Sequence, residues 1–540
     1  MRPLINIIRA HCTILFVLGS TLLVYSLRIF LFDGTGDDGD SLTHFLIAKY
    51  ACVHPDLFYD HWGKPFFTLL AFPFALLGFK GIQCFNLLNL LSCQIALYLI
   101  GKKLDLKFNW LPSLFLGFCL ISIKVIPSGL TEPLCANILS WAVLGFFSDR
   151  YYTSTILISF LPFVRSEGLI ILILAAILLL YIHKWLLMPL LSFGHLVMGL
   201  LGMKYHNGDF FWTIHNIPYP VNGAFYGLGS PFHFILNTPE MLGPILTVMF
   251  LGGLILITFL PLVLYRKSSD TNVKIFFILI VGSVMGFYFF HSYAWAAGRF
   301  NSYGLTRVMF AVMPMISILA WIPIEFISRN KTGRWINTIF VSSLIGIHFY
   351  TLYYGKYALK KDDFNIKTSQ EVLVKATHKL MQSEAYYSSN LLLYDAPYLS
   401  VLLNIDPHGN KYERTLSILE LNRRFPLNTI IIWDQYYSGE HSKILLNSLL
   451  QDNRLNLLFE VNEYDYNGKI DKCAVFKIKP EFAIDYSSPE VQNKLEAIKI
   501  NLVNDSLFFP KLKKQSSKIG VTMDSCLNLN AKYFLEREKR

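Results

Sequence analysis

Long uncharged apolar runs alternate with short polar segments over the first two thirds of the chain. A membrane-spanning helix needs about 20 consecutive apolar residues. The pattern therefore predicts an all-α polytopic membrane domain over residues 1–354, with about eleven membrane-spanning helices. The predicted spans are 11–32, 82–101, 108–125, 132–148, 152–164, 168–183, 186–203, 241–265, 275–291, 304–328 and 336–354.

Basic residues set the predicted orientation, because Lys and Arg concentrate in cytoplasmic loops. Loops such as 102–107 and 266–274 fall on the same side as Arg2 and Arg9, which places the N-terminus in the cytoplasm and the C-terminus outside. The apolar segment 65–79 decides this parity. It is short for a span and contains Pro65 and Pro73, so we expect a re-entrant or interfacial helix on the outer side.

The pattern changes near residue 355, where Lys, Asp, Asn and Ser become frequent. Strand-like and helix-like segments then alternate, which predicts a small soluble α/β domain over residues 355–482. The expected strands are Leu391–Tyr394, Thr429–Trp433, Leu455–Val461 and Ala474–Ile478, and the expected helices are Ser369–Ser383 and Ser442–Gln451. A polar tail, residues 483–540, follows and is expected to be helical in part.

Composition narrows the class of protein. Of the 540 residues, 53% are hydrophobic and 16% are charged, which excludes a disordered chain and argues against a wholly soluble enzyme. The net charge of +11 is explained by the basic inner loops, so no nucleic acid partner is inferred. No CxxC motif or Cys/His spacing indicates zinc among the eight cysteines.

The first outward loop contains four carboxylates within eight residues, Asp33, Asp37, Asp38 and Asp40. One interpretation is a solvated Asx/Gly turn. A calcium loop is disfavoured, because the twelfth position counted from Asp33 is His44 and not an acid. The functional interpretation is a general base that deprotonates a hydroxyl group.

The next three outward loops also carry polar residues beside apolar helices. Glu132 begins a predicted span, where its charge either favours the helix N-terminus or serves a site. Arg165 and Glu167 form either a local ion pair or part of a functional site. The loop 204–240 is rich in aromatic residues, Pro and Gly, which suits an interfacial belt or a cleft for a sugar or a lipid headgroup.

Two arginines at the outer boundary, Arg299 and Arg307, oppose the charge bias of membrane proteins. A binding partner should therefore hold the two guanidinium groups at this boundary. A phosphate is a natural partner, because a guanidinium group binds phosphate through two hydrogen bonds. Arg28, near the outer end of the first span, suggests the same more weakly, since its side chain can simply reach the interface.

Taken in order, these loops resemble the GT-C superfamily of integral membrane glycosyltransferases, which includes protein O-mannosyltransferases, lipid A aminoarabinose transferases and dolichyl-phosphate-mannose-dependent mannosyltransferases. The resemblance covers residues 1–354. The segments that carry it are Asp37-Asp38-Gly39-Asp40, His61-Trp62-Gly63-Lys64-Pro65, Thr131-Glu132-Pro133, Arg165-Ser166-Glu167-Gly168 and Gly298-Arg299 through Arg307. It implies a polyprenyl-phosphate-linked sugar donor and inverting transfer to a hydroxyl group at the outer face.

The resemblance also implies roles for individual residues. It assigns the general base to Asp40, with Asp37 and Asp38 as alternatives, because Ser41–Ala48 looks like the amphipathic helix that follows the superfamily's acid. Many members have Asp-Glu where this chain has Asp40-Ser41, so the identity of the acid stays open. The expected donor-phosphate ligands are Arg165, Arg299, Arg307, Lys64 and His61, and the expected substrate contacts are Glu132, Glu167, His215, Tyr219 and Trp62.

Several alternatives stay open at the sequence level. A divalent metal, Mg²⁺ or Mn²⁺, would suit a site beside three Asp residues, but some relatives work without one, so no metal ligand and no cofactor is assigned. The acceptor is a lipid, a glycan or a protein, and membrane lipid surrounds the spans. The predicted location is the bacterial inner membrane with the site and the soluble domain in the periplasm; the alternative is the endoplasmic reticulum. A transporter or flippase of lipid-linked saccharides, or a surface-polysaccharide polymerase or ligase, is the alternative function.

Overall fold

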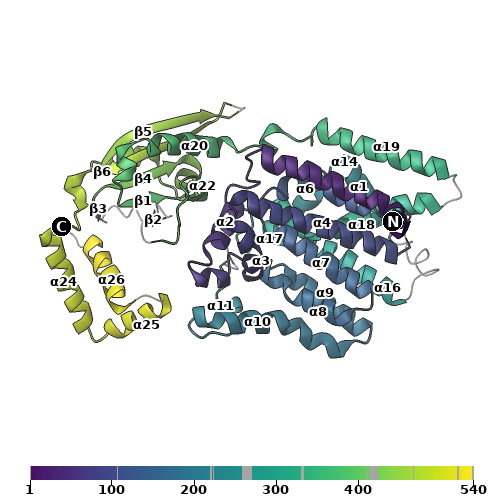
Figure 1. The fold of residues 1–540 in the computed structure, drawn as a ribbon, viewed down its shortest axis with the longest axis horizontal. Coiled ribbons are helices and arrows are strands. Elements are labelled where there is room, and N and C mark those ends of the chain that lie inside the picture. Colours follow the sequence, from purple (N-terminus) through teal and green to yellow (C-terminus); the bar gives the residue numbers. More distant parts are fainter. Residues whose placement is uncertain are drawn as a thin grey trace. The chain divides into compact units, whose positions relative to one another are not determined.

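The computed structural model describes residues 2–105, 107–218, 222, 224–257, 270–329, 334–409, 412–413, 424–465, 468–519 and 522–537. The chain divides into two compact units, an N-terminal unit of residues 1–365 and a C-terminal unit of residues 366–540. The described part of the N-terminal unit is built of helices and loops, and the C-terminal unit combines a β-sheet with helices (Figure 1).

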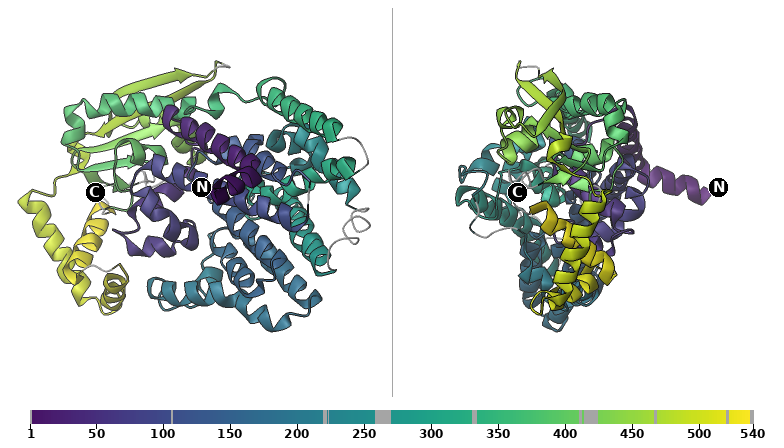
Figure 2. Two further views of the ribbon diagram at one scale, coloured as in Figure 1. Left: turned by 45° about the vertical axis from the view of Figure 1, so that its right-hand side comes forward. Right: turned by 90° about the vertical axis from the view of Figure 1, so that its left-hand side faces the viewer.

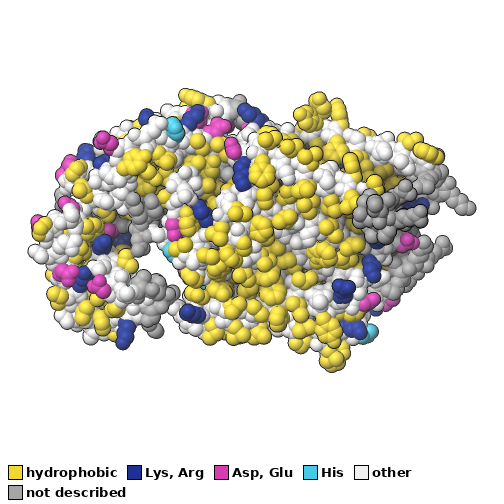
Figure 3. All heavy atoms as spheres, viewed as in Figure 1, with side chains coloured by type: hydrophobic (Ala, Val, Ile, Leu, Met, Phe, Trp, Pro, Cys, Tyr) yellow, Lys and Arg dark blue, Asp and Glu magenta, His cyan; other side chains and the backbone are white. Residues whose placement is uncertain are grey.

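Six helical segments of the described residues are long and apolar enough to cross a membrane. They are His11–Leu31, Phe79–Lys103, Trp185–Tyr205, Asp270–Ala296, Thr306–Ser328 and Trp335–Tyr353. Hydrophobic side chains cover most of the surface over α1 (Arg2–Leu31), α4 (Phe79–Lys103) and α9 (Gly168–Tyr181), with few charged groups between them (Figure 3). This surface is of the kind expected against lipid, and the N-terminal unit has the character of an integral membrane domain.

The remaining predicted spans are shorter or interrupted helices. The predicted span 108–125 is two helices, α5 (Leu111–Phe118) and α6 (Leu120–Val125), because the backbone of Cys119 between them is extended. Three others, α7 (Glu132–Phe147), α9 and α14 (Pro244–Leu256), have 16, 14 and 13 residues, less than the roughly 20 needed to cross the hydrocarbon core without help from flanking segments. The last part of the predicted span 241–265 lies outside the described residues.

Most other helices of the N-terminal unit overlap or adjoin a predicted apolar run. They are α8 (Tyr151–Ser159), α10 (Phe193–Gly202), α16 (Asp270–Ile275), α17 (Gly282–Ala296), α18 (Met313–Arg329) and α19 (Arg334–Tyr353). A π-helical stretch, Phe276–Val281, joins α16 to α17, and 3₁₀ turns at Trp185–Ser192 and Thr306–Val312 precede α10 and α18. These helices lie side by side, and the beginning of α1 projects beyond them (Figure 2).

The segment predicted as a re-entrant or interfacial helix forms α3 (Pro65–Ala75), with Pro65 in its first turn and Pro73 inside it. Short elements fill the loops on either side of it and farther along the chain. They are α2 (Asp40–Tyr50), the 3₁₀ turns Pro55–Tyr59, Leu161–Phe163, Met203–Tyr205 and Lys361–Asp363, α11 (Trp212–His215), α12 (His233–Leu236) and α13 (Thr238–Leu242).

Two buried amide side chains of α4 bind the loop after α1 and the loop before α7 at one end of the helix bundle. Gln83, near the start of α4, donates to the carbonyl oxygens of Gly34 and Pro127 at 3.1 and 2.9 Å. One turn later Asn86 donates to the carbonyl of Ser128 at 2.7 Å. The end of α1, the start of α4 and the start of α7 therefore meet at the same end of the N-terminal unit, which we call the loop end.

The C-terminal unit is built on a five-stranded sheet in the order β2-β1-β4-β6-β5. Its central strands, β1 (Leu391–Tyr394) and β4 (Thr429–Asp434), pair in parallel, and β6 (Ile470–Ile478) runs antiparallel to both β4 and β5 (Leu455–Tyr464). Every residue of β1 and β4 is buried. Both faces of the sheet are therefore covered, which explains the continuous apolar runs that predicted these strands.

Helix α20 (Thr368–Met381) covers one face of this sheet. Its residues Val372, Leu373, Ala376 and Leu380 share one apolar core with Leu392, Ile430 and Val475. Smaller elements complete the sheet unit: α21 (Glu384–Tyr387), α22 (Pro397–Leu402), β2 (Tyr412–Glu413), β3 (Phe425–Pro426), the π-helical turn Gln435–His441, α23 (Leu446–Leu450), the 3₁₀ turn Pro480–Phe482 and β7 (Ala483–Ile484).

The polar tail is helical over most of its described length. It forms α24 (Pro489–Asn504), α25 (Phe509–Ile519) and α26 (Met523–Arg537). These helices have a small core of their own, which contains Leu495, Leu502, Leu512, Cys526, Ala531 and Leu535.

A candidate active site at the loop end of the helix bundle

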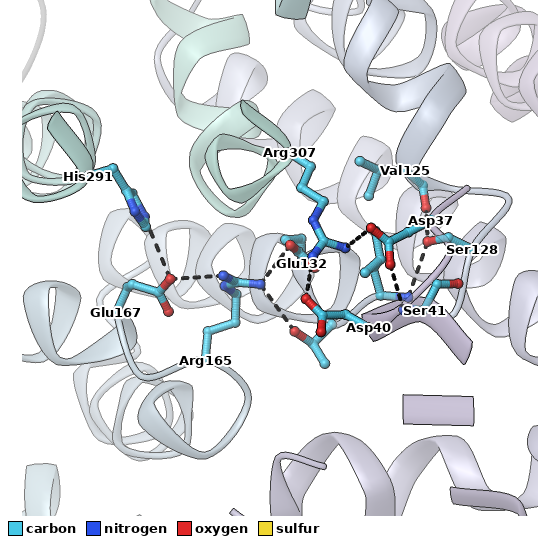
Figure 4. A network of polar contacts seen from close by, with 12 residues as sticks. Asp37, Asp40, Ser41, Val125, Ser128, Glu132, Arg165, Glu167, His291 and Arg307 are labelled. Carbon is cyan, nitrogen blue, oxygen red and sulfur yellow. Dashed lines mark hydrogen bonds and ion pairs between the residues drawn. The ribbon is translucent and has the colours of Figure 1, made fainter. Parts of the chain in front are cut away.

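The centre of the site is an ion-paired cluster of Arg307, Asp37 and Asp40. Arg307 comes just after the start of the 3₁₀ turn that leads into α18, and both aspartates belong to the acidic loop after α1. One terminal nitrogen of Arg307 lies 3.1 Å from Oδ2 of Asp37, and the other donates to Oδ2 of Asp40 (Figure 4). The cluster joins residues that are 267 positions apart.

Local backbone contacts explain how the acidic loop is shaped. Oδ1 of Asp37 accepts hydrogen bonds from the backbone N–H groups of Gly39 and Ser41, at 2.8 and 3.3 Å, and so satisfies donors at the start of α2. The hydroxyl of Ser41 accepts from the N–H of Gly129 at 2.8 Å. A Cβ atom at Gly129 would lie 2.3 Å from the carbonyl oxygen of Ser41, so only glycine lets the second loop approach this closely.

Helix α2 differs from the expected amphipathic helix. It forms as predicted, directly after the acidic loop, but Ser41, Leu42, His44 and the run Phe45–Ala48 are all buried. Phe45 packs edge-on against Phe79 at the start of α4, and His44 packs edge-on against Phe67 of α3. Neighbouring helices cover α2 on most sides, so Asp40 stands at the end of a rigid, buried element.

Asp40 has one carboxylate oxygen in an ion pair and a side chain that is only partly buried. Its Oδ2 is bound by Arg307, whereas Oδ1 has no hydrogen-bond partner among the described residues, and the side chain is 37% exposed. Burial alone would raise the pKa of Asp40, but Arg307, together with His44 and Arg165, lowers it below its ordinary value. The group is therefore ionised at neutral pH, with one oxygen accessible.

A second ion-paired cluster adjoins the first. The two terminal nitrogens of Arg165 lie 2.7 Å from Oε1 of Glu132 and 2.8 Å from Oε1 of Glu167. Nε2 of His291, on α17, lies 3.6 Å from the same Glu167 oxygen (Figure 4). Glu132 is only 2% exposed. Buried carboxylates of this kind require a charged partner. Arg165 is that partner for Glu132 in one loop and for Glu167 in another.

These contacts fix the charges of the second cluster. Burial would raise the pKa of Glu167, but Arg165 and His291 lower it to about 2. Burial would likewise lower the pKa of Arg165, and Glu132 and Glu167 outweigh that effect and raise it above its ordinary value. Both groups are therefore permanently ionised near neutral pH, and neither is suited to donating or accepting a proton during a reaction.

Lys64 approaches the clusters from the other side of the acidic loop. It precedes Pro65 of α3 with a φ angle of 61°, in the left-handed region that is unfavourable for lysine. Its Nζ donates to the hydroxyl of Ser166 at 3.1 Å. Burial lowers the pKa of Lys64 to about 8, against the opposing charge of Glu167. Strain of this kind is often retained at functional sites.

The structure places the other predicted site residues outside the two clusters. Nε2 of His61 bonds to the carbonyl of Thr213 at 3.1 Å, and Trp62 packs against the small core of Ile47, Ala51 and Leu57. His215 is exposed and pairs with Asp209 at 2.9 Å. Asp38 lies half-buried in the acidic loop. Tyr219 lies outside the described residues.

The two remaining arginines differ from Arg165 and Arg307. Within the described part of the chain, Arg299 has no side-chain ion pair, and only its backbone is bonded, its N–H donating to Ala294 at 2.9 Å. Arg28 is buried and donates to the carbonyl of Asp363 at 2.8 Å, and its guanidinium lies over the rings of Phe32 and Phe364. Arg28 thus anchors the segment after α19 and has no role in the two clusters.

Sequence reasoning did not assign the residues that complete the clusters. His291 could have been recognised from the sequence, because it is a polar residue at the end of an apolar run. The loop that contains Arg299 and leads to Arg307 follows it directly. His44 lies one helical turn after Asp40, so that both fall on one face of α2. Thr131, whose hydroxyl lies 3.4 Å from Arg165, and Ser166 sit beside residues that were assigned.

A divalent metal does not fit this arrangement. In the part of the chain that the structure describes, no group of three or more His, Cys, Asp or Glu side chains is arranged to hold an ion. Asp37, Asp40, Glu132 and Glu167 each direct an oxygen at an arginine nitrogen. The carboxylates are thus matched to guanidinium groups, and the residues present give no basis for a step through Mg²⁺ or Mn²⁺.

Comparisons with known proteins add only distant neighbours. No protein-family model and no curated protein matches the sequence. Among solved structures, the chain is similar to the oligosaccharyltransferase of Archaeoglobus fulgidus, tethered to an acceptor peptide in one structure and bound to an inhibitory peptide and a dolichol-phosphate in another. Each match has a TM-score of 0.43 and 12% identity and covers 96% of this chain and 85% of the other. Both neighbours are GT-C glycosyltransferases, the class that the loops resemble, but at this score the function of this chain rests on its own residues.

Proposed function

We propose that this chain is an inverting glycosyltransferase that moves a sugar from a polyprenyl-phosphate-linked donor to an acceptor hydroxyl at the outer face of a membrane. The observation that carries the proposal is the state of Asp40. One oxygen of its carboxylate is held by Arg307, and the other is open at the loop end of an apolar helix bundle. A general base needs this combination of fixed position, ionised state and access.

In the proposed reaction, Oδ1 of Asp40 accepts the proton of the acceptor hydroxyl as its oxygen attacks the anomeric carbon. The bond from that carbon to the phosphate oxygen breaks on the opposite side, so the configuration at the anomeric carbon inverts. Arg307 keeps Asp40 in place throughout, and Asp37 shares the same guanidinium group. The chemistry requires no covalent intermediate on the protein.

Cations must stabilise the charge of the leaving phosphate. The contacts in the site favour different residues for this role from those predicted from the sequence. Arg165 and Arg307 were predicted to bind phosphate directly, but each already bridges two carboxylates. A phosphate would have to compete with those contacts. Lys64, whose pKa of about 8 keeps it largely protonated at neutral pH, and Arg299, which has no ion pair among the described residues, are the better candidates for direct contact.

The position of the charged groups favours an enzyme over a transporter or flippase. Asp40, Glu132, Glu167 and Arg307 all lie at helix ends, beside the starts of α2, α7, α9 and α18. Transporters usually bind their substrates near the middle of the membrane, between broken helices. A cluster at the loop end suits a lipid-linked donor, whose phosphate lies at the interface while its prenyl chain lies along apolar helices.

The decisive experiment compares Asp40→Asn with the wild-type chain. Both proteins are reconstituted in lipid nanodiscs with a panel of radiolabelled polyprenyl-phosphate hexoses and a membrane extract as the source of acceptor. We expect the wild type to release polyprenyl phosphate and the variant to lose roughly 10²–10⁴-fold in rate.

A matched control is available in the same loop. Asp33 is highly exposed, and its only ion pair with a described residue is a long contact of 3.6 Å with Lys80. Asp33→Asn should therefore react at the wild-type rate. If Asp40→Asn keeps full activity, Asp40 is not the base. If no donor is turned over by the wild type, while in sealed proteoliposomes it moves the lipid-linked sugars across the bilayer, the chain is a transporter.

A further inference from the structure

Two tyrosines present a pair of aromatic rings at the loop end. The ring centroids of Tyr226 and Tyr303 are 4.6 Å apart, and the ring planes are tilted by 39°. Tyr226 is 37% exposed and Tyr303 is 50% exposed. Large aromatic side chains usually bury such surface, so an exposed pair held in contact is a feature with room for a ligand. We call it the tyrosine platform.

Close contacts between two loops hold the tyrosine platform in place. The N–H of Gly229 donates to the carbonyl of Trp295 at 3.2 Å, and His233 bonds to the carbonyl of Gly304 at 2.7 Å. A Cβ atom at Gly229 would lie 1.6 Å from Nε1 of Trp295. The loop that carries Tyr226 is therefore pressed against the loop that carries Tyr303, and the two rings do not depend on each other alone for their position.

The loop that carries Tyr303 leads directly to Arg307, the residue that binds the candidate base. Burial, and then the nearby charge of Asp40, raise the pKa of the Tyr226 hydroxyl, with Tyr303 contributing to the same shift. Tyr303 lies only three residues before Thr306, where the 3₁₀ turn that contains Arg307 begins, and Arg307 donates to Asp40. Lys64 interacts with Asp40 as well, but comes from the start of α3 and bonds to Ser166. Lys64 and the tyrosine platform thus come from different segments of the chain, and both are influenced by the charge of Asp40.

Resting on the function proposed above, we propose that the tyrosine platform is the acceptor subsite and that the acceptor is a carbohydrate, whose apolar ring face stacks on Tyr226 and Tyr303. The geometry of the reaction requires the acceptor to lie next to Asp40 and opposite the leaving phosphate. A sugar ring has one face of C–H groups that suits an aromatic ring, and hydroxyl groups at its edge that suit the tyrosine hydroxyls. Stacking would turn one of its hydroxyls toward Oδ1 of Asp40.

Carbohydrate binding can be measured without turnover. The full chain is placed in lipid nanodiscs free of glycoside detergents, and saturation-transfer NMR is recorded with a panel of methyl hexopyranosides and short oligosaccharides. We expect the C–H protons of at least one sugar to receive saturation. Tyr226→Ala and Tyr303→Ala should weaken its binding by roughly three- to tenfold, whereas Tyr226→Phe and Tyr303→Phe, which keep the rings, should retain most of it.

Two further variants make the result specific. Phe232→Ala removes an aromatic side chain from the same loop, 62% exposed, and should leave sugar binding unchanged. Asp40→Asn should also keep sugar binding, because stacking does not need the base. Absence of binding to every sugar, equal binding by the Ala variants, or binding of a peptide or phospholipid in a way that depends on Tyr226 would each overturn the proposal. Loss of transfer without loss of sugar binding would instead identify a defect of the catalytic step alone.

Discussion

Asp40 and Arg307 are two charged residues whose properties depend on each other. Neither is buried without compensation, because the carboxylate and the guanidinium neutralise one another at the edge of an apolar bundle. The pair also sets the ionisation of the candidate base. Burial favours the neutral acid, and the ion pair with Arg307 keeps the pKa of Asp40 below its ordinary value.

This dependence gives a pH prediction for Arg307→Gln. In the wild type, Asp40 is deprotonated at all pH values above its lowered pKa, so the acid limb of the rate profile lies below the ordinary carboxyl range. Without Arg307, burial remains and raises the pKa while His44 and Arg165 still lower it, so the acid limb of the rate profile should move to higher pH. Rates of polyprenyl phosphate release across the pH range measure the shift.

Arg299→Gln serves as the comparison, because it removes a cation without touching Asp40. It should weaken donor binding and leave the acid limb in place. An Arg307→Gln variant whose acid limb stays where the wild type has it would contradict the role of Arg307 in setting the ionisation of Asp40.

At the scale of single residues, the sequence indicated which charges matter but not how they pair. Asp40, Arg165, Glu132 and Arg307 stood out because charged residues beside apolar runs need a reason to be there. Their partners lie far away in the sequence, and no periodicity connects residues 40 and 307. Arg165 and Arg307 were therefore predicted to bind a phosphate directly. The carboxylates with which they form ion pairs had been given other roles.

At the scale of elements, apolar periodicity predicted what local forces determine. The strands β1, β4 and β6 and the helix α20 were predicted within a few residues, since continuous or alternating apolar runs reflect burial on one or both faces. The break between α5 and α6 could not be predicted, because Cys119 is neither proline nor glycine and its extended backbone follows from tertiary packing. Among the described residues, six of the predicted spans contain a helix long enough to cross a membrane, and the others are shorter or interrupted.

The carboxyl end of β4 offers a stability prediction that concerns the C-terminal unit alone. Asp434 is buried there and accepts hydrogen bonds from the N–H of Tyr437 and the hydroxyl of Ser438, at 2.7 and 3.1 Å. Burial, with a contribution from nearby Asp395, raises its pKa to about 6. Cys473 is its partner across the sheet.

Because folding raises this pKa, protonated Asp434 favours the folded state. The stabilisation is complete below pH 4 or so and is lost as the pH rises through about 6, a change on the order of 3 kcal/mol. Hydrogen exchange of the segment 424–484 in the full chain should therefore show weaker protection at pH 8 than at pH 5, after correction for intrinsic rates. In Asp434→Asn this difference should shrink. Equal pH dependence in the variant and the wild type would contradict the assignment.

At the scale of the whole molecule, the helix directions make a topological prediction. The acidic loop, loop 204–240 and the segment after α19 should all face the outside. Cys52 is free and exposed, next to α2. It should react with a membrane-impermeant maleimide in intact cells, and so should Ser388→Cys in a Cys52→Ser background.

Thr153→Cys in the same background is the opposite case, since Thr153 is exposed at the start of α8 and the predicted topology places it in the cytoplasm. It should react only after the membrane is made permeable. Labelling of Thr153→Cys in intact cells, with protection of Ser388→Cys, would reverse the orientation and move the candidate site to the cytoplasmic face.

The ion pair between Asp40 and Arg307 also has a consequence for how the chain is made. The acidic loop leaves the ribosome 267 residues before the arginine that neutralises two of its carboxylates. Until that arginine has been synthesised and its helix has entered the bilayer, the loop carries an uncompensated charge beside lipid. A chain that ends before Arg307 therefore lacks the cation that pairs with Asp37 and Asp40.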